Sequence, residues 1–231
     1  MESWGAVIVA AGTGSRMGSA VSKQFLPLGD KPVLVHALEV FQRSSDIGRM
    51  VLVVGADDVE LGWQYVREYK LDKCSAVVAG GAGRQDSVYA GLKALAPGTE
   101  WVMVHDGVRP FVTEEQIRRV REAAVRHGAA VLAVPVKDTV KVVHPEGWIE
   151  STPDRSKLWA IQTPQAFRLE ELLHAHESAR RDGFAGTDDA MLVERLGRRV
   201  HIAEGAYSNI KITTPEDLHW GAFWIKERDK S

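Results

Sequence analysis

Short apolar runs alternate with segments of helical periodicity along most of the chain. The first run, residues 6–10, is entirely apolar, which is typical of a strand that is buried on both faces of a sheet. Runs of this kind also predict strands at residues 50–54, 75–79, 101–105, 129–134, 158–161, 200–203 and 210–212. Strands that alternate with helices indicate an α/β fold, Rossmann-like, with a mostly parallel sheet and helices on both of its faces.

The segments between these strands have apolar residues at helical spacing. Helices are expected after Pro32, at residues 59–66, 88–95 and 169–181, after Thr187 and after Thr214. Thr113 and Gln116 have the spacing of a capping box, which predicts another helix that begins at about Glu114.

Residues 136–155 interrupt this alternation. Two β-prone segments, residues 139–144 and 148–152, flank a Pro-Glu-Gly turn and predict a β-hairpin. An isolated hairpin with few strongly apolar residues is marginally stable, so we expect an arm that packs onto a second subunit. The alternative is a solvent-exposed hairpin on a monomer. We therefore expect a single domain over residues 1–231, with a β-arm at about 136–155 that forms a homodimer.

Composition excludes several classes of protein. The net charge of −2, from 29 basic and 31 acidic residues, argues against a general binder of nucleic acid or of anionic membranes. Cys74 is the single cysteine, so neither an intrachain disulfide nor a cysteine-based zinc cluster can form. The sequence has no apolar run of about 20 residues and no basic segment near its start, so we expect a cytoplasmic protein.

A glycine-rich stretch follows the first predicted strand. Gly12, Gly14 and Gly18 lie close to Arg16 and Lys23, a combination that suits a polyphosphate. The stretch lacks the Gly-Lys-Ser/Thr end of a Walker loop, and its glycine spacing differs from that of the dinucleotide fingerprint. The alternative is a glycine turn with two solvated basic residues.

Further polar residues follow the other predicted strands. In a parallel sheet these strand ends meet at one edge, where ligands bind. The residues collected there are Arg16, Lys23, 80–83, Arg84, Ser87, Asp106, Arg109, Asp138, Thr139, Thr163 and Lys211. This set is suited to nucleotidyl transfer, because cations bind phosphates and a carboxylate such as Asp106 can bind Mg²⁺. Asp106 could instead accept hydrogen bonds from turn N–H groups.

The chain offers no obvious Ser-His or Cys-His pair for covalent catalysis. His105 adjoins Asp106 but points to the opposite face of its strand, so we interpret it as structural. Direct attack by a substrate phosphate is the simpler mechanism, since a phosphate oxyanion needs no general base.

Six blocks of sequence resemble one known family over nearly the whole chain. The blocks include AAGTGSRMG with KQFL, GGAGRQDSVYAGL, VHDGVRPF, PVKDTVK, DRSKLWAIQTPQAF, and TDDA with NIKITTPEDL. They resemble the 2-C-methyl-D-erythritol 4-phosphate cytidylyltransferases, which transfer CMP from CTP to a methylerythritol phosphate in the non-mevalonate route to isoprenoids. The resemblance implies a Mg²⁺-dependent enzyme that releases pyrophosphate. Cytidylyltransferases that act on pentitol phosphates share most of these blocks.

The resemblance also implies roles for individual residues. Those implied to bind the nucleotide are Ala10, Ala11, Gly12, Gly14, Gly81, Ala82 and Ser87. Those implied to be catalytic are Arg16, Lys23, Asp106, which would bind the metal, and Lys211. Those implied to bind the polyol phosphate are Arg109, Thr139, Arg155, Thr163, Thr187 and Lys211, with Thr139, Arg155 and Arg109 acting across the dimer.

Three positions depart from the family pattern. Ser22 replaces a proline before Lys23, Gly107-Val108 replaces Ala-Ala, and Ala82 stands where the family often has an acidic residue. Two other functions remain open at this point: the same reaction on ribitol phosphate, and a non-catalytic nucleotide-binding regulator. A paired assay with both polyol phosphates distinguishes the first alternative from a methylerythritol phosphate cytidylyltransferase. A nucleotide that binds without release of pyrophosphate would favour the regulator.

Overall fold

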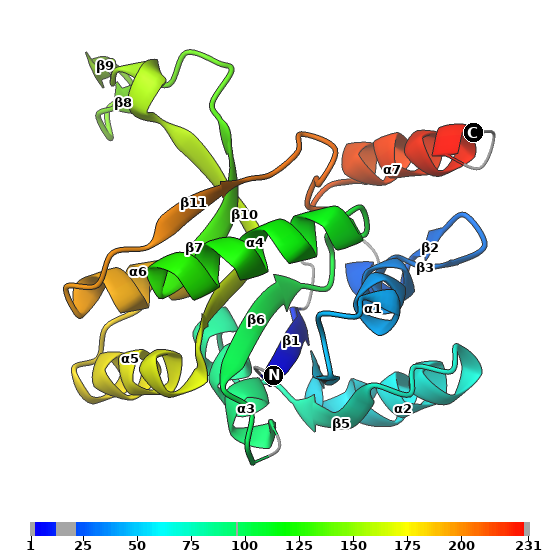
Figure 1. The fold of residues 1–231 in the computed structure, drawn as a ribbon. Coiled ribbons are helices and arrows are strands. Elements are labelled where there is room, and N and C mark those ends of the chain that lie inside the picture. Colours follow the sequence, from blue (N-terminus) through cyan, green and yellow to red (C-terminus); the bar gives the residue numbers. More distant parts are fainter. Residues whose placement is uncertain (1–2, 13–21, 96, 229–231) are drawn as a thin grey trace.

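A seven-stranded sheet forms the centre of the computed structural model, which describes residues 3–12, 22–95 and 97–228 (Figure 1). The strand order is β11-β7-β10-β6-β1-β4-β5. The bounds are β1 Trp4–Ala10, β4 Arg49–Val54, β5 Cys74–Ala79, β6 Trp101–Asp106, β7 Ala129–Pro135, β10 Trp159–Arg168 and β11 His201–Glu204. Strand β10 is antiparallel to its neighbours β6 and β7, and the other pairs are parallel. The predicted α/β fold with a mostly parallel sheet is confirmed.

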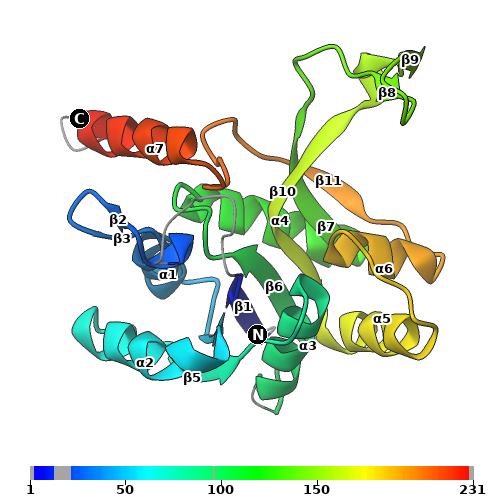
Figure 2. The same cartoon turned by 180° about the vertical axis from the view of Figure 1, so that it is seen from behind.

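Helices cover both faces of the sheet (Figures 1 and 2). The bounds are α1 Val33–Arg43, α2 Val59–Glu68, α3 Arg84–Ala94, α4 Glu114–His127, α5 Leu169–Arg181, α6 Asp189–Arg195 and α7 Pro215–Arg228. Successive side chains of β1 point to opposite faces. Ile8 therefore joins one buried cluster with residues of α1 and α4, while Val7 joins a second cluster with residues of α3, α5 and α6. Burial on both sides explains why β1 is apolar throughout.

The capping-box prediction is confirmed at the start of α4. The Gln116 N–H donates to Thr113 Oγ1 at 3.2 Å, and the Thr113 N–H donates to Gln116 Oε1 at 3.1 Å. The helix ends at His127, and Gly128 follows with a φ of 91°, a conformation that glycine adopts without strain.

Two strand predictions need correction. Residues 210–212 do not form a strand; the Ile212 N–H donates to the Val108 carbonyl, which is too little pairing for a ladder. Strand β10 is longer than the predicted residues 158–161, because it continues through Pro164 to Arg168. Its register shifts between Ile161 and Gln165, which accommodates a residue without an N–H donor.

The predicted hairpin projects from the sheet between β7 and β10 (Figure 1). It consists of the antiparallel strands β8 (Val142–Val143) and β9 (Ile149–Ser151). Val143, Trp148 and Ile149 are each more than half exposed, so the hairpin buries little of its own apolar surface. We refer to this projecting segment, about residues 136–155, as the arm.

Two short strands complete the fold. The strands β2 (Pro27–Leu28) and β3 (Lys31–Pro32) pair antiparallel, and α7 packs against them through Ile225 and Leu28.

Cys74 is buried at the start of β5, and burial raises the pKa of its thiol to about 11. Among the described residues, no helix is both long and apolar enough to cross a lipid bilayer.

Candidate active site

A pocket of about 500 Å³ lies at the carboxyl ends of β1, β5 and β6. This is the edge of the sheet that the sequence predicts. The described residues that line the pocket are Val9, Ala10, Ala11, Gly12, Lys23, Gln24, Gly81, Ala82, Gly83, Arg84, Ser87, Asp106, Val108 and Lys211. The structure thus brings together residues from both ends of the chain.

The loop between β5 and α3 forms one wall of the pocket. A Cβ atom on Gly80 would lie 2.4 Å from the Ala11 Cβ, and one on Gly81 would lie 2.4 Å from the Asp86 Cβ. Glycine is therefore required for the loop to approach the end of β1 this closely. The buried Ser87 hydroxyl donates to the Gly83 carbonyl at 2.9 Å and accepts from the Gly81 N–H at 3.2 Å, which fixes the shape of the loop.

A single 3-10 turn, Lys23–Phe25, places Lys23 at the pocket. The neighbouring Gln24 is buried, and its Nε2 donates to the Ala10 carbonyl at 2.6 Å. This hydrogen bond ties the turn to the last residue of β1. Gln24 was missed by the sequence analysis, although a polar residue between Lys23 and two apolar residues was a usable signal.

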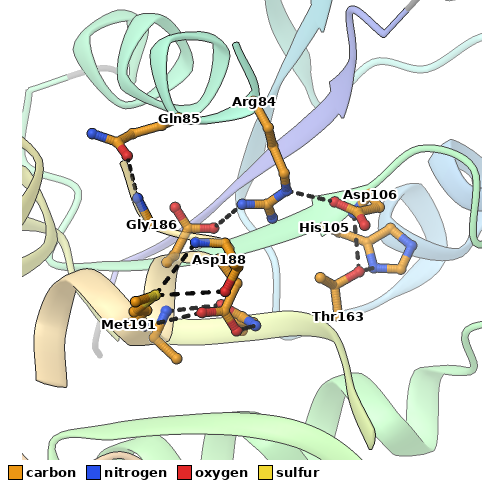
Figure 3. Close-up of polar contacts among 12 residues, drawn as sticks. Arg84, Gln85, His105, Asp106, Thr163, Gly186, Asp188 and Met191 are labelled. Atoms are coloured by element: carbon orange, nitrogen blue, oxygen red, sulfur yellow. Dashed lines mark hydrogen bonds and ion pairs between the residues drawn. The ribbon is translucent and has the colours of Figure 1, made fainter. Parts of the chain in front are cut away.

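Asp106 lies at the end of β6 with a cation on each carboxylate oxygen, and Figure 3 shows the Arg84 contact. Arg84 Nε donates to Oδ1 at 3.1 Å, and Lys211 Nζ donates to Oδ2 at 2.7 Å. Burial alone would raise the pKa of this carboxyl, but the positive charges of Arg84 and Lys211 hold it well below its usual range. Asp106 is therefore ionised at neutral pH and available as a ligand for a hard cation.

His105 lies behind Asp106 and not in the pocket. Its ring is buried beside Phe41, with ring centroids 5.1 Å apart. Nε2 is 3.2 Å from the Arg109 carbonyl and must donate to it, so Nδ1 accepts from the Thr163 hydroxyl at 3.1 Å. Burial lowers the pKa of His105 to about 4, and the ring is neutral at pH 7. The structure agrees with the interpretation of His105 as a structural residue.

Thr163 connects the antiparallel strand β10 to this centre. Its Oγ1 accepts a hydrogen bond from the Asp106 N–H at 3.0 Å, while its hydroxyl proton is used by His105 (Figure 3). The side chain is buried and does not line the pocket. In this structure Thr163 fixes the backbone at Asp106.

Several other residues from the sequence analysis lie outside the pocket. Arg109 donates through Nη1 to the Asn209 carbonyl at 2.7 Å, and its buried Nε has no hydrogen-bond partner among the described residues. Thr187 is exposed and lies near the Met191 sulfur. Thr139 and Arg155 are exposed on the arm, where Arg155 donates to the Lys137 carbonyl at 2.7 Å. Gly14 and Arg16 fall outside the described residues.

Arg84 and Asp189 are further members of the site. Arg84 follows a predicted strand and Asp189 lies in the TDDA block, but the sequence assigns neither residue a role. Arg84 Nη1 donates to Asp189 Oδ2 at 2.8 Å while its Nε contacts Asp106, so one guanidinium joins two buried carboxylates. An adjacent pair of acidic residues before a short helix was the available signal, but its partner lies 105 residues away.

Comparison with known proteins gives a consistent result. The family model described as IspD: 2-C-methyl-D-erythritol 4-phosphate cytidylyltransferase matches residues 5–227. A protein of Desulforamulus reducens with that name is 49% identical over 225 residues, which is 97% of this chain and 96% of the relative. A protein of the same name from Geobacillus kaustophilus is 50% identical over 213 residues, with 92% of each chain covered.

Solved structures agree with the sequence comparison. The 4-diphosphocytidyl-2C-methyl-D-erythritol synthase of Anaerococcus prevotii superposes with a TM-score of 0.86 at 34% identity, covering 97% of this chain and 96% of the other. The cytidylyltransferase of Thermus thermophilus gives a TM-score of 0.78 at 33% identity, covering 95% of this chain and 98% of the other.

Proposed function

This chain belongs to the family of 2-C-methyl-D-erythritol 4-phosphate cytidylyltransferases, and from that membership we propose how its pocket performs the reaction. The chain transfers CMP from CTP to 2-C-methyl-D-erythritol 4-phosphate, giving 4-diphosphocytidyl-2-C-methyl-D-erythritol and pyrophosphate in isoprenoid biosynthesis. The observation that supports the placement of the chemistry is Asp106, ionised between Arg84 and Lys211 at the pocket.

The cytidine end of CTP would occupy the wall formed by the two glycine-containing loops. Ala10, Ala11 and Gly12 continue from β1, and Gly81 and Ala82 face them from the loop after β5. Small residues leave backbone N–H and carbonyl groups accessible to a base and a ribose. Ser87 contributes by fixing that loop, since its hydroxyl is already bonded to Gly83.

The triphosphate would extend toward Lys23, with Gly14 and Arg16 as further proposed contacts from the glycine-rich stretch. The acceptor phosphate attacks the α-phosphorus, forming a new P–O bond. The bond from that phosphorus to the α–β bridging oxygen breaks, and pyrophosphate leaves with the electron pair. Lys23 and Lys211 would stabilise the negative charge that develops on the phosphoryl oxygens.

Magnesium is the proposed metal, and the residues fit it in one specific way. Asp106 is the only carboxylate among the described residues that line the pocket, and the described residues contain no cluster of three candidate ligands. Mg²⁺ is commonly held by one or two carboxylates together with substrate phosphates. Bound in this manner, it would neutralise phosphate charge. Asp106 would hold it and Lys211 would orient Asp106.

The polyol phosphate would bind on the open side of the pocket. Arg109 is a proposed contact for this anion; its Nη1 donates to the Asn209 carbonyl at 2.7 Å, which holds the guanidinium in place. Thr187 and Lys211 are proposed as further contacts, and Thr163 would act indirectly, by fixing the backbone at Asp106. Thr139 and Arg155 lie on the exposed arm, so we propose that they act on the site of a partner subunit in a homodimer.

The arm itself supports that dimer. Val143, Trp148 and Ile149 are more than half exposed on a hairpin that projects from the sheet. Exposed apolar side chains gathered on one projecting element support the proposal that a protein partner covers them. We further propose that residues 1–231 act as one nucleotidyltransferase domain with the arm at about 136–155. A cytoplasmic location is also proposed, since a single cysteine suits a reducing compartment.

A paired assay tests the choice of substrate. Purified protein is incubated with CTP, magnesium chloride and either methylerythritol phosphate or ribitol phosphate, and pyrophosphate release is measured. We expect turnover with methylerythritol phosphate and a kcat/KM at least about tenfold lower with ribitol phosphate, since pocket contacts supply about 1–3 kcal/mol of discrimination. The reverse preference would refute the assigned acceptor, and CTP binding without pyrophosphate release would indicate a regulator.

A further inference from the structure

A chain of polar side chains extends from Asp106 into the protein. Arg84 on α3 contacts Asp106 on one side and Asp189 on the other, at 3.1 and 2.8 Å. Asp189, the first residue of α6, accepts a second hydrogen bond through Oδ1 from His176 Nε2 on α5, at 3.0 Å. Residues of α3, β6, α6 and α5 therefore meet behind the proposed metal ligand. Figure 3 shows the contact between Arg84 and Asp106.

The inner part of this chain is fully buried. The side chains of His176 and Asp189 are 0% and 1% exposed. Removing charged and polar groups from water carries a large desolvation penalty, and a buried ion pair often contributes no more stability than apolar residues of the same volume. A gain in the free energy of unfolding therefore does not explain why His176, Asp189 and Arg84 are buried together.

Only one of the two ring nitrogens of His176 has a hydrogen-bond partner among the described residues. Because Nε2 faces a carboxylate, that nitrogen carries the proton. The buried Nδ1 has no hydrogen-bond partner among the described residues. A buried polar atom without a hydrogen-bond partner is destabilising. Among the described residues, Asp189 is thus the one hydrogen-bond partner of the His176 ring.

Asp189 is itself fixed by the start of α6. The preceding Asp188 caps this helix by accepting from the Met191 N–H at 3.0 Å, and it also accepts from Gln165 Nε2 at 2.8 Å. The Ala190 N–H donates to Gln165 Oε1 at 3.1 Å. Gln165 therefore pins the first turn of α6 to strand β10, and Asp189 has little freedom to move.

The guanidinium of Arg84 connects the fixed Asp189 carboxylate to Asp106 in the pocket. Its donors lie in a rigid plane, so fixing Nη1 on Asp189 also fixes the direction of Nε. That direction leads to Asp106 Oδ1. A lysine at this position would have one ammonium group and could not hold both carboxylates in the same geometry.

We propose that His176 and Asp189 are positioning residues that hold Arg84, and through it orient the Asp106 carboxylate for magnesium-bound nucleotide. The inference rests on the proposed role of Asp106 as the metal ligand. It assigns a function in the reaction to two buried residues that do not line the pocket.

The test compares CTP binding with and without magnesium chloride by isothermal titration calorimetry. His176→Phe keeps an aromatic ring but removes the donor to Asp189, and Asp189→Asn removes the charge that holds Arg84. In both variants we expect the tightening of CTP binding by magnesium to fall about tenfold, the scale of one charge-assisted hydrogen bond. CTP affinity without magnesium should stay within about twofold. His176→Gln, whose amide can donate to Asp189, should restore part of the magnesium effect.

Asp182→Asn is the matched control. It removes an exposed ion pair of Asp182, the residue after α5, with Arg195 at the end of α6, at 2.7 Å. This pair has no connection to Asp106. We expect it to keep the full magnesium effect and to cost little thermal stability, because an exposed ion pair contributes little. If His176→Phe and Asp189→Asn also keep the full magnesium effect, the positioning role is refuted while the proposed function stands. If the wild-type protein shows neither a magnesium effect nor pyrophosphate release, the proposed function fails, and the positioning role with it.

Discussion

Arg155 provides the most direct test of a site shared between subunits. It lies in the arm, in the short 3-10 turn Arg155–Lys157, and is exposed, with one hydrogen bond to the Lys137 carbonyl. Within its own chain it does not line the pocket. If it contributes to catalysis, it therefore does so in a neighbouring subunit. The perturbation is Arg155→Ala.

The size of the effect follows from the contact that would be lost. A charge-assisted hydrogen bond to a phosphate is worth about 1.5–3 kcal/mol, so the KM for the polyol phosphate should rise about 10- to 150-fold. The KM for CTP should change little, because the residues proposed to hold CTP lie in the pocket. Lys157→Ala is the control, since it removes a cation from the same exposed turn.

Mixing two inactive variants makes the prediction sharper. Arg155→Ala is combined with Lys23→Ala, which disables the pocket, and subunits are allowed to exchange. In a shared-site dimer, half of the molecules are mixed and each has one intact site of two, so about a quarter of wild-type pyrophosphate release should return. No recovery after confirmed exchange would refute the reasoning, as would an equal rise in both KM values for Arg155→Ala.

Three other perturbations test the site and the core. Lys23→Ala, and likewise Arg16→Ala, should slow turnover by about 10²–10³ without unfolding the protein, and near-normal kcat values would contradict their proposed role. His105 is neutral when folded but binds a proton below about pH 6.5 when unfolded, so about 3 kcal/mol of unfolding free energy should be lost between pH 6.5 and 4. Urea titrations at several pH values would measure the free energy of unfolding of the wild type and of His105→Gln. We expect this free energy to depend less on pH in the variant. Gly91→Ala places a Cβ 2.4 Å from Val7 Cγ1 and should lower Tm by about 5 °C, because overpacking costs about 1–3 kcal/mol.

The fold was predictable wherever the hydrophobic pattern had a single interpretation. The all-apolar run of β1 identified its strand directly, because burial on both faces requires apolar residues at successive positions. The capping box of α4 identified the start of its helix, because its hydrogen bonds join residues only three positions apart. Strand β10 was harder, since Pro164 interrupts its pattern and its antiparallel direction depends on the arm that precedes it. Residues 210–212 read as a strand because Ile210 and Ile212 alternate, but they bury that pattern against α7 and not in the sheet.

The site was predictable in part. Lys23, Asp106 and Lys211 each follow a predicted strand or lie in a recognised block, and the structure brings all three to one pocket. The proposed roles of Arg84 and Asp189 depend on a contact across 105 residues, which no local pattern encodes. The sequence could not show that the Thr163 hydroxyl is already used by His105 and the Asp106 N–H, because that depends on where β10 enters the sheet.

The single buried cysteine makes the protein its own reporter of unfolding. Cys74 is 6% exposed, and its thiol has a pKa of about 11, so at neutral pH the folded protein presents almost no thiolate to a modifying reagent. A thiol reagent such as a disulfide dye should therefore react only when β5 detaches from β4 and the edge of the sheet opens. A cysteine introduced at the exposed tip of the arm would react at once in the same molecule. Sequential labelling with two dyes would then place a donor and an acceptor at known positions without any cysteine having to be removed.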